Sequence, residues 1–231
     1  KNKSYGDIHS IFILGYTKDI FKNELSARQE FGFVSTAEME ELVELQKSEH
    51  ESKSIAEKVS NLRNKYYRRI SERRMGGIYS FYGYRQLFNR VVNQQDIAVQ
   101  LKKRQTSEDI DIIGLDPQQL RDWIRHGKVR LNKPFIESMR HSLVICDEVH
   151  NIYYHKDVNA YGLAIEIIND YFNEPKLYNP EWTPNDEKCI RWLFLSATPL
   201  TYTPTEIVPI INILNLAPFR VSQSDIFDEK T

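Results

Sequence analysis

An apolar run that ends in two acidic residues constrains the fold of this chain most. Residues 143–146 read Leu-Val-Ile-Cys, and Asp147 and Glu148 follow them directly. A short apolar run of this kind predicts a buried strand of a parallel sheet, which helices cover on both faces. Because open α/β sheets bind their ligands at the carboxyl ends of the strands, we expect both acids to lie at that edge.

A second apolar run, residues 192–195, leads into Ser196, Ala197 and Thr198. Hydroxyl groups at a strand end are suited to respond to small movements of nearby acids, but they also suit a turn before a proline. His150 follows the acids closely, and no second residue stands at a metal-ligand spacing from it. We therefore expect His150 to link the acids to Ser196 and Thr198.

The acidic pair matches the needs of phosphoryl transfer. One acid at a strand end holds Mg²⁺, and a second acid beside it can orient and deprotonate a water molecule. Adjacent residues of a strand point to opposite faces, so the chain must turn between Asp147 and Glu148 for both to reach one site. The alternative is two solvated acids at the start of a loop, and the downstream Ser196 and Thr198 favour the ATP-hydrolysing site.

Hydrophobic periodicity predicts strands that alternate with helices, and hence an α/β fold with a parallel sheet wrapped by helices. Further strands are expected at residues 10–16 and 78–82. Helices are expected at 17–25, 36–75 (a helical insertion with a polar break at 46–54), 84–92, much of 94–140, 158–172 and 205–215. Pro209 either kinks the last helix or marks a later start. We expect one partial domain over 1–215 and a polar linker over 216–231.

Composition limits the class of protein. The 231 residues include 31 basic and 32 acidic side chains, so any binding of nucleic acid must come from local patches. The absence of an 18-residue apolar run and of a signal-peptide pattern predicts an intracellular protein that is not secreted. Cys146 and Cys189 flank predicted strands and are expected to be buried free thiols.

Three places are candidates for contact with nucleic acid. Thr17 and Lys18 stand at a predicted strand end and helix start, which is a favourable place for a phosphate. Residues 65–74 mix cations with aromatic rings, as surfaces that track a nucleic-acid backbone do, although a solvated helix face explains the same pattern. Arg85 follows an aromatic run that either stacks on bases or belongs to the core.

The sequence contains no motif of a phosphate-binding loop. Gly127-Lys128 is the only Gly-Lys pair, and it lacks both the Ser or Thr and the upstream glycine of such a loop. It predicts the end of a helix instead. We expect the loop to precede this chain in a longer protein, so that the chain alone binds ATP weakly and turns it over poorly or not at all.

These motifs resemble the first RecA-like (P-loop NTPase) lobe of a two-lobe superfamily 2 helicase of the DEAH-like type. Residues 11–18 resemble motif Ia and 81–89 a motif Ib region, while 147–150 (Asp-Glu-Val-His) resemble motif II and 196–198 motif III. The runs at 31–35 and 81–84 are similar to helicase-type proteins of large cytoplasmic DNA viruses, in particular the family of the poxvirus-type early transcription factor small subunit.

The resemblance implies a role for each candidate residue. Asp147 would coordinate Mg²⁺, Glu148 would act as catalytic base, and His150, Ser196 and Thr198 would couple hydrolysis to lobe movement. Thr17, Lys18 and Arg85 would face nucleic acid. The cofactors would be ATP and Mg²⁺, and the partners DNA or RNA, a second transcription factor subunit and RNA polymerase.

The implied function is that of a fragment of an ATP-dependent helicase or translocase in viral early transcription initiation, located in the host cytoplasm and the virion. Two alternatives remain open. One is a non-catalytic RecA-like module for DNA binding or assembly, and the other is a Snf2-type remodelling ATPase.

Overall fold

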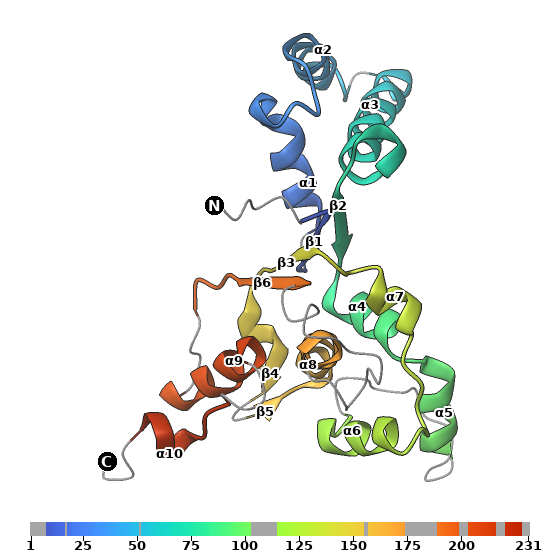
Figure 1. The fold of residues 1–231 in the computed structure, drawn as a ribbon. Coiled ribbons are helices and arrows are strands. Elements are labelled where there is room, and N and C mark those ends of the chain that lie inside the picture. Colours follow the sequence, from blue (N-terminus) through green and yellow to red (C-terminus); the bar gives the residue numbers. More distant parts are fainter. Residues whose placement is uncertain are drawn as a thin grey trace, which may run out of the picture.

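The computed structural model describes residues 8–16, 18–50, 52–102, 115–154, 157–173, 189–198, 203–215 and 220–227. Four parallel strands form the main sheet in the order β2-β1-β3-β6 (Figure 1). Their bounds are β1 Ser10–Leu14, β2 Tyr79–Tyr82, β3 Ser142–Cys146 and β6 Ile190–Phe194. Helices surround this sheet, so the predicted α/β class is confirmed.

The main core lies between the sheet and the helices that follow the strands. These helices are α4 (Tyr84–Val91), α5 (Gln94–Lys102), α6 (Pro117–Arg125), α7 (Lys133–Glu137), α8 (Ala160–Asn173) and α9 (Ile207–Leu214). Helix α8 is the most deeply buried of them, because twelve of its fourteen residues are buried. Its packing partners include α4, and Tyr84 stacks on Tyr161 with ring centroids 6.4 Å apart. The carboxyl ends of β1, β2 and β3 thus share one packed core.

A second, smaller group of helices lies between β1 and β2 in the sequence. It contains α1 (Lys18–Ala27), the 3-10 turn η1 (Gln29–Phe31), α2 (Thr36–Lys47), α3 (Lys53–Ser71) and the 3-10 turn η2 (Arg73–Met75). These helices project away from α4–α9 on the other side of the sheet (Figure 1). Val34, Leu42, Val59 and Tyr66 form a separate apolar cluster among them.

A partly exposed ion pair between Glu38 and Arg69 joins α2 to α3. The Ser35 side chain caps α2 and exchanges hydrogen bonds with Glu38, as the capping-box spacing predicts. Arg69 donates to both carboxylate oxygens of Glu38, at 2.7 and 2.8 Å. The hydrogen bonds from Arg69 lower the pKa of the Glu38 carboxyl to about 2. Glu38 is therefore ionised at neutral pH and joins the two helices.

Several predicted bounds shift in the structure. Helix α8 begins at Ala160 because Asp157–Val158 forms β5, which pairs with β4 (Tyr153–Tyr154). The last long helix begins at Ile207, after the 3-10 turn η5 (Pro204–Glu206). Pro209 therefore lies in the first turn, where no hydrogen bond is lost, and the later start is the correct alternative.

Within the segment that we expected to be a polar linker, residues 223–226 form the short helix α10 (Gln223–Ile226). Asp225 explains it, because its carboxylate accepts hydrogen bonds from the backbone N–H and the hydroxyl of Ser222, at 2.6 and 2.7 Å. Val221 and Asn212 exchange two hydrogen bonds that hold this segment against α9. Within the described ranges, no helix is long and apolar enough to cross a membrane.

Candidate functional site

The carboxyl ends of β3 and β6 bring the acidic pair and Ser196 to the same edge of the sheet. Cys146 pairs with Phe194 in the register of these strands, so the residues that follow each strand are neighbours. The backbone continues the pairing beyond the strands: the Asp147 N–H donates to the Leu14 carbonyl at 2.8 Å. The site is therefore built on three adjacent strands and not on a free loop.

Glu148 provides the turn that the two acids need. Its backbone is left-handed, with φ 53° and ψ 52°, which is uncommon for a residue with a side chain. The 3-10 turn η3 (Val149–Ile152) begins directly after it. Strained conformations of this kind persist where the surrounding contacts hold them, and they concentrate at functional sites.

His150 joins Glu148 to Ser196. Its Nδ1 atom lies 3.0 Å from Ser196 Oγ and 3.3 Å from Glu148 Oε2. The Asn151 side-chain amide donates to His150 Nε2 at 3.2 Å and to the Glu148 carbonyl at 3.0 Å. With Nε2 accepting, the ring proton of a neutral His150 is on Nδ1, where it faces Ser196 and Glu148.

Thr198 takes part through its backbone. Its N–H donates to Ser196 Oγ at 3.2 Å, and its side chain is exposed. The structure thus gathers Asp147, Glu148, His150 and Ser196 at one place, with Thr198 as a support for the Ser196 hydroxyl. The roles assigned to these residues remain predictions.

Two residues next to Asp147, Tyr84 and Gly15, belong to the site but were not predicted from the sequence. The Tyr84 hydroxyl donates to the Asp147 carbonyl at 2.6 Å, and Tyr84 itself is only 2% exposed. Gly15 follows β1, and a Cβ added there would lie 3.3 Å from Asp147 Cβ, so a glycine leaves room for the acid. The sequence offered an aromatic run and a glycine at a strand end, but nothing that paired them with Asp147.

The environment of Asp147 disfavours its charge. Burial raises the pKa of the Asp147 carboxyl above its usual value, and the neighbouring Glu148 raises it further. Within the described residues, no three His, Cys, Asp or Glu side chains are grouped to hold a metal ion. A lone carboxylate nevertheless fits Mg²⁺, which proteins often hold by one or two carboxylates together with water and substrate phosphates.

We expect Asp147→Asn to leave the fold as stable as before or slightly more stable. A carboxyl whose pKa is raised on folding stabilises the protein when protonated, and this contribution is lost as the pH rises through the folded-state pKa. Thermal unfolding of both proteins between pH 4 and pH 8 checks this prediction. The difference in favour of Asn should be larger at pH 8. A clear loss of stability at pH 8 would show that ionised Asp147 supports the fold.

Two of the predicted residues for nucleic-acid contact, Lys18 and Arg85, lie on helices that follow β1 and β2, and the third lies outside the described residues. Arg85 is exposed in the first turn of α4, which follows β2, and no ion pair of Arg85 is found among the described residues. Lys18 is the first residue of α1, which follows β1, and its side chain lies outside the described part. Thr17 lies outside the described residues altogether.

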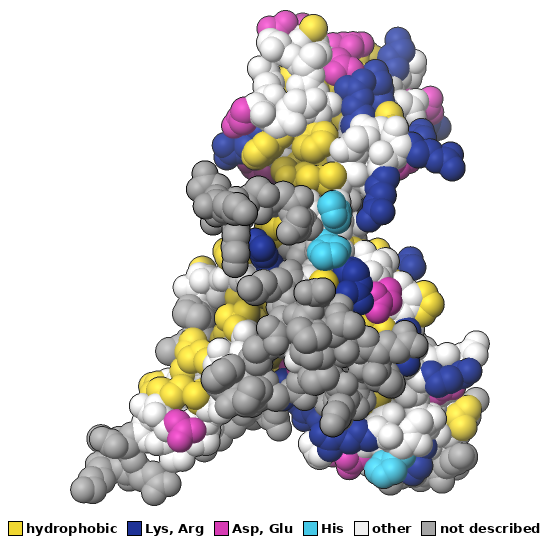
Figure 2. Space-filling model, viewed as in Figure 1, with side chains coloured by type: hydrophobic (Ala, Val, Ile, Leu, Met, Phe, Trp, Pro, Cys, Tyr) yellow, Lys and Arg dark blue, Asp and Glu magenta, His cyan; other side chains and the backbone are white. Residues whose placement is uncertain are grey.

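Several of the cationic and aromatic side chains at residues 65–74 make contacts within the protein. Tyr66 is buried, Arg69 binds Glu38, and Arg68 donates to Glu72 at 2.6 Å. Acidic side chains lie among the Lys and Arg side chains of these helices (Figure 2). Gly127 likewise has a structural role, because it ends α6 with a φ of 67°. The reading of Gly127-Lys128 as a helix end is confirmed.

Comparison with curated proteins finds relatives in African swine fever virus. The chain is 30% identical over 219 residues to the early transcription factor large subunit homolog of isolate Tick/Malawi/Lil 20-1/1983, covering 88% of this chain and 19% of the relative. The homolog of the Vero-adapted strain Badajoz 1971 is 30% identical over 223 residues, covering 88% and 18%. No protein-family model matches the chain, and no solved structure matches it.

This similarity makes the chain a homologue of one segment of these viral proteins, and it spans about a fifth of their length. The relatives are named for the large subunit, whereas the resemblance described from the sequence was to the small subunit. The resemblance described from the sequence and the comparison with curated proteins both point to a viral early transcription factor.

Proposed function

We propose that this chain forms the acid-bearing part of a RecA-like lobe in an ATP-dependent translocase or helicase that acts in viral early transcription. The homology to a viral early transcription factor subunit supports the role in transcription. The parallel sheet, with acids and hydroxyls at the carboxyl ends of neighbouring strands, supports the chemistry.

The observation that carries the proposal is the link from Glu148 through His150 to Ser196, in which His150 Nδ1 lies 3.3 Å from Glu148 Oε2 and forms a hydrogen bond with Ser196 Oγ. It spans two neighbouring strands, because Glu148 follows β3 and Ser196 follows β6. In a nucleotide site the Glu148 carboxylate would orient a water molecule and accept its proton. Mg²⁺ bound beside Asp147 would neutralise phosphate charge. A displacement of the segment after β6 would move His150, and with it the carboxylate of Glu148.

The position of Arg85 suits contact with a nucleic-acid backbone near that link. Helix α4 begins at the end of β2, and the Tyr84 hydroxyl next to Arg85 donates to the Asp147 carbonyl. A nucleic-acid strand bound at Arg85 would therefore influence Asp147 through the adjacent residue Tyr84. This arrangement gives the proposed translocase a path from bound strand to hydrolysis.

A double-mutant cycle tests the link. In the natural protein at full length, we expect His150→Ala and Ser196→Ala each to lower DNA-stimulated ATP turnover by about tenfold, with the double variant close to either single one. His126→Ala is the matched control, because His126 is exposed at the end of α6 and, among the described residues, forms hydrogen bonds only within its own helix. Losses that multiply in the double variant would show that His150 and Ser196 act separately.

A further inference from the structure

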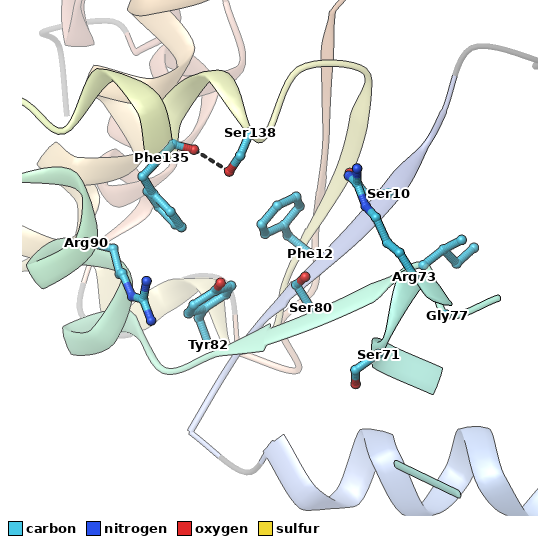
Figure 3. Close-up of a pocket in the computed structure, with 11 residues that line it drawn as sticks. Ser10, Phe12, Ser71, Arg73, Gly77, Ser80, Tyr82, Arg90, Phe135 and Ser138 are labelled. Atoms are coloured by element: carbon cyan, nitrogen blue, oxygen red, sulfur yellow. Dashed lines mark hydrogen bonds between the residues drawn. The ribbon is translucent and has the colours of Figure 1, made fainter. Parts of the chain in front are cut away.

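A cavity of about 290 Å³ lies on a face of the sheet, and none of the acidic site residues lines it. Eleven residues from β1, β2, α4, α7 and the end of the insertion surround it (Figure 3). They include two arginines, four serines and three aromatic residues, and no acidic side chain. The cavity is at the lower end of the size range of small-molecule pockets.

The two arginines make this cavity electropositive. Arg73 and Arg90 reach it from opposite sides, with Phe12, Ser80 and Tyr82 between them (Figure 3). Neither arginine forms an ion pair with another described residue, in contrast to Arg68 and Arg69. A guanidinium offers paired N–H donors that match a phosphate group, so both side chains are available to an anion.

A buried hydroxyl in the same wall lacks a partner. Ser10 is 5% exposed, and no described group forms a hydrogen bond with its Oγ atom. Buried polar atoms without a partner are rare in folded proteins, and each requires an explanation. Because Ser10 lines the cavity, a bound ligand toward which this side chain turns would supply the missing hydrogen bond.

Aromatic rings form the remaining wall. Phe12 and Tyr82 are stacked, with ring centroids 6.0 Å apart and an angle of 15° between the planes. Phe135 meets Tyr82 edge-on at 5.8 Å, and the Arg90 guanidinium lies 6.0 Å from the Phe135 ring. Surfaces that combine such rings with arginines accept flat heterocycles next to phosphate groups.

We propose that this cavity is a nucleotide-binding site, in which Arg73 and Arg90 hold the phosphate, Ser10 bonds a ligand oxygen, and the aromatic wall receives the base. The nucleotide is either a free mononucleotide or one unit of a nucleic-acid strand. The site is separate from Asp147 and Glu148 and does not depend on the proposed ATP hydrolysis.

Calorimetric titration with AMP, in EDTA and on the full-length protein, tests the site without Mg²⁺. We expect Arg73→Gln and Arg90→Gln each to weaken binding about tenfold, as the loss of a charged hydrogen bond does. Arg74→Gln is the matched control, since Arg74 is also exposed in η2 but does not line the cavity. Because Arg73 and Arg90 line the cavity and Asp147 and Glu148 do not, weaker AMP binding in the arginine variants separates this site from the acidic one.

Two further titrations examine how the ligand is recognised. Adenosine and inorganic phosphate should each bind more weakly than AMP. Ser10→Ala should lower AMP affinity without lowering the melting temperature, because it removes a buried hydroxyl that has no partner in the free protein. A purely structural Ser10 would lower the melting temperature and leave the affinity as it was, against the proposal.

A short single-stranded oligonucleotide identifies the source of the nucleotide. Tighter binding of the oligonucleotide than of AMP, weakened by the same two arginine variants, supports a strand. Tighter binding of AMP supports a free nucleotide. The proposal is overturned if neither ligand binds at millimolar concentration, or if Arg74→Gln weakens binding as much as Arg73→Gln does.

Discussion

Glu148→Gln should lower ATP turnover by about 10²- to 10⁴-fold, the usual contribution of a catalytic base. The substitution keeps the size and the hydrogen-bonding shape of the side chain but removes its ability to accept a proton. Glu148 has a left-handed backbone held between β3 and η3, so its position does not depend on its charge. ATP affinity, measured by equilibrium binding, should therefore stay within about twofold of wild type, a change of less than about 0.5 kcal/mol.

Glu40→Gln is the control for this experiment. Glu40 is exposed on α2, far in the sequence from the acidic pair, and the same change of charge there should leave turnover intact. Both variants are measured in the full-length protein with DNA present. Equal turnover in Glu148→Gln and wild type would remove Glu148 from the chemistry.

Gly162→Ala should destabilise the fold by about 3 kcal/mol or more, as severe overpacking of a core does. Gly162 lies in α8 where the helix crosses η3, and an added Cβ would overlap the Ile152 carbonyl oxygen. The same Cβ would lie 2.9 Å from Val158 Cβ. Because the contact with Ile152 is a contact with backbone, the helix and η3 would have to move apart, and His150 would move with η3.

Urea unfolding followed by circular dichroism measures this effect. Gly83→Ala is the matched control, because a Cβ there has no heavy atom closer than 3.9 Å and the φ of −78° suits alanine. Its effect should stay below about 1 kcal/mol. An equally stable Gly162→Ala protein would mean that α8 does not pack on η3 as closely as the structure shows.

The sheet and the edge that carries the acids were predictable from local patterns. The apolar runs at β1, β2 and β3 are short and end in turn residues or acids, which is enough to indicate parallel strands. Asp147 and Ser196 then follow, because strands of one parallel sheet end at the same edge. Strand β6 begins two residues before the predicted apolar run at 192–195, because Ile190 and Arg191 pair with Ser142 and Leu143 of β3.

The contacts that hold the site were not predictable, because they join residues far apart in the sequence. Tyr84 reaches Asp147 across 63 positions, and His150 reaches Ser196 across 46. A sequence pattern shows which residue types are present but not which side chains meet. The same limit applies to Arg69, whose partner Glu38 lies 31 positions away, so its cation pattern suited a nucleic-acid surface equally well.

The cavity shows this limit most clearly. The residues that line it are spread along the sequence from Ser10 to Ser138. Its arginines, aromatic residues and serines therefore form no recognisable sequence motif. Only the packing of η2 and α7 around the β1–β2 face brings them together.

The rate of ATP hydrolysis by the natural protein at full length tests the central claim most directly. It is measured with and without Mg²⁺, and with and without DNA. The proposed site at Asp147 and Glu148 predicts turnover that requires Mg²⁺ and rises when DNA is added. Absence of turnover above background in all four conditions would contradict the claim and leave a non-catalytic module as the function of this lobe.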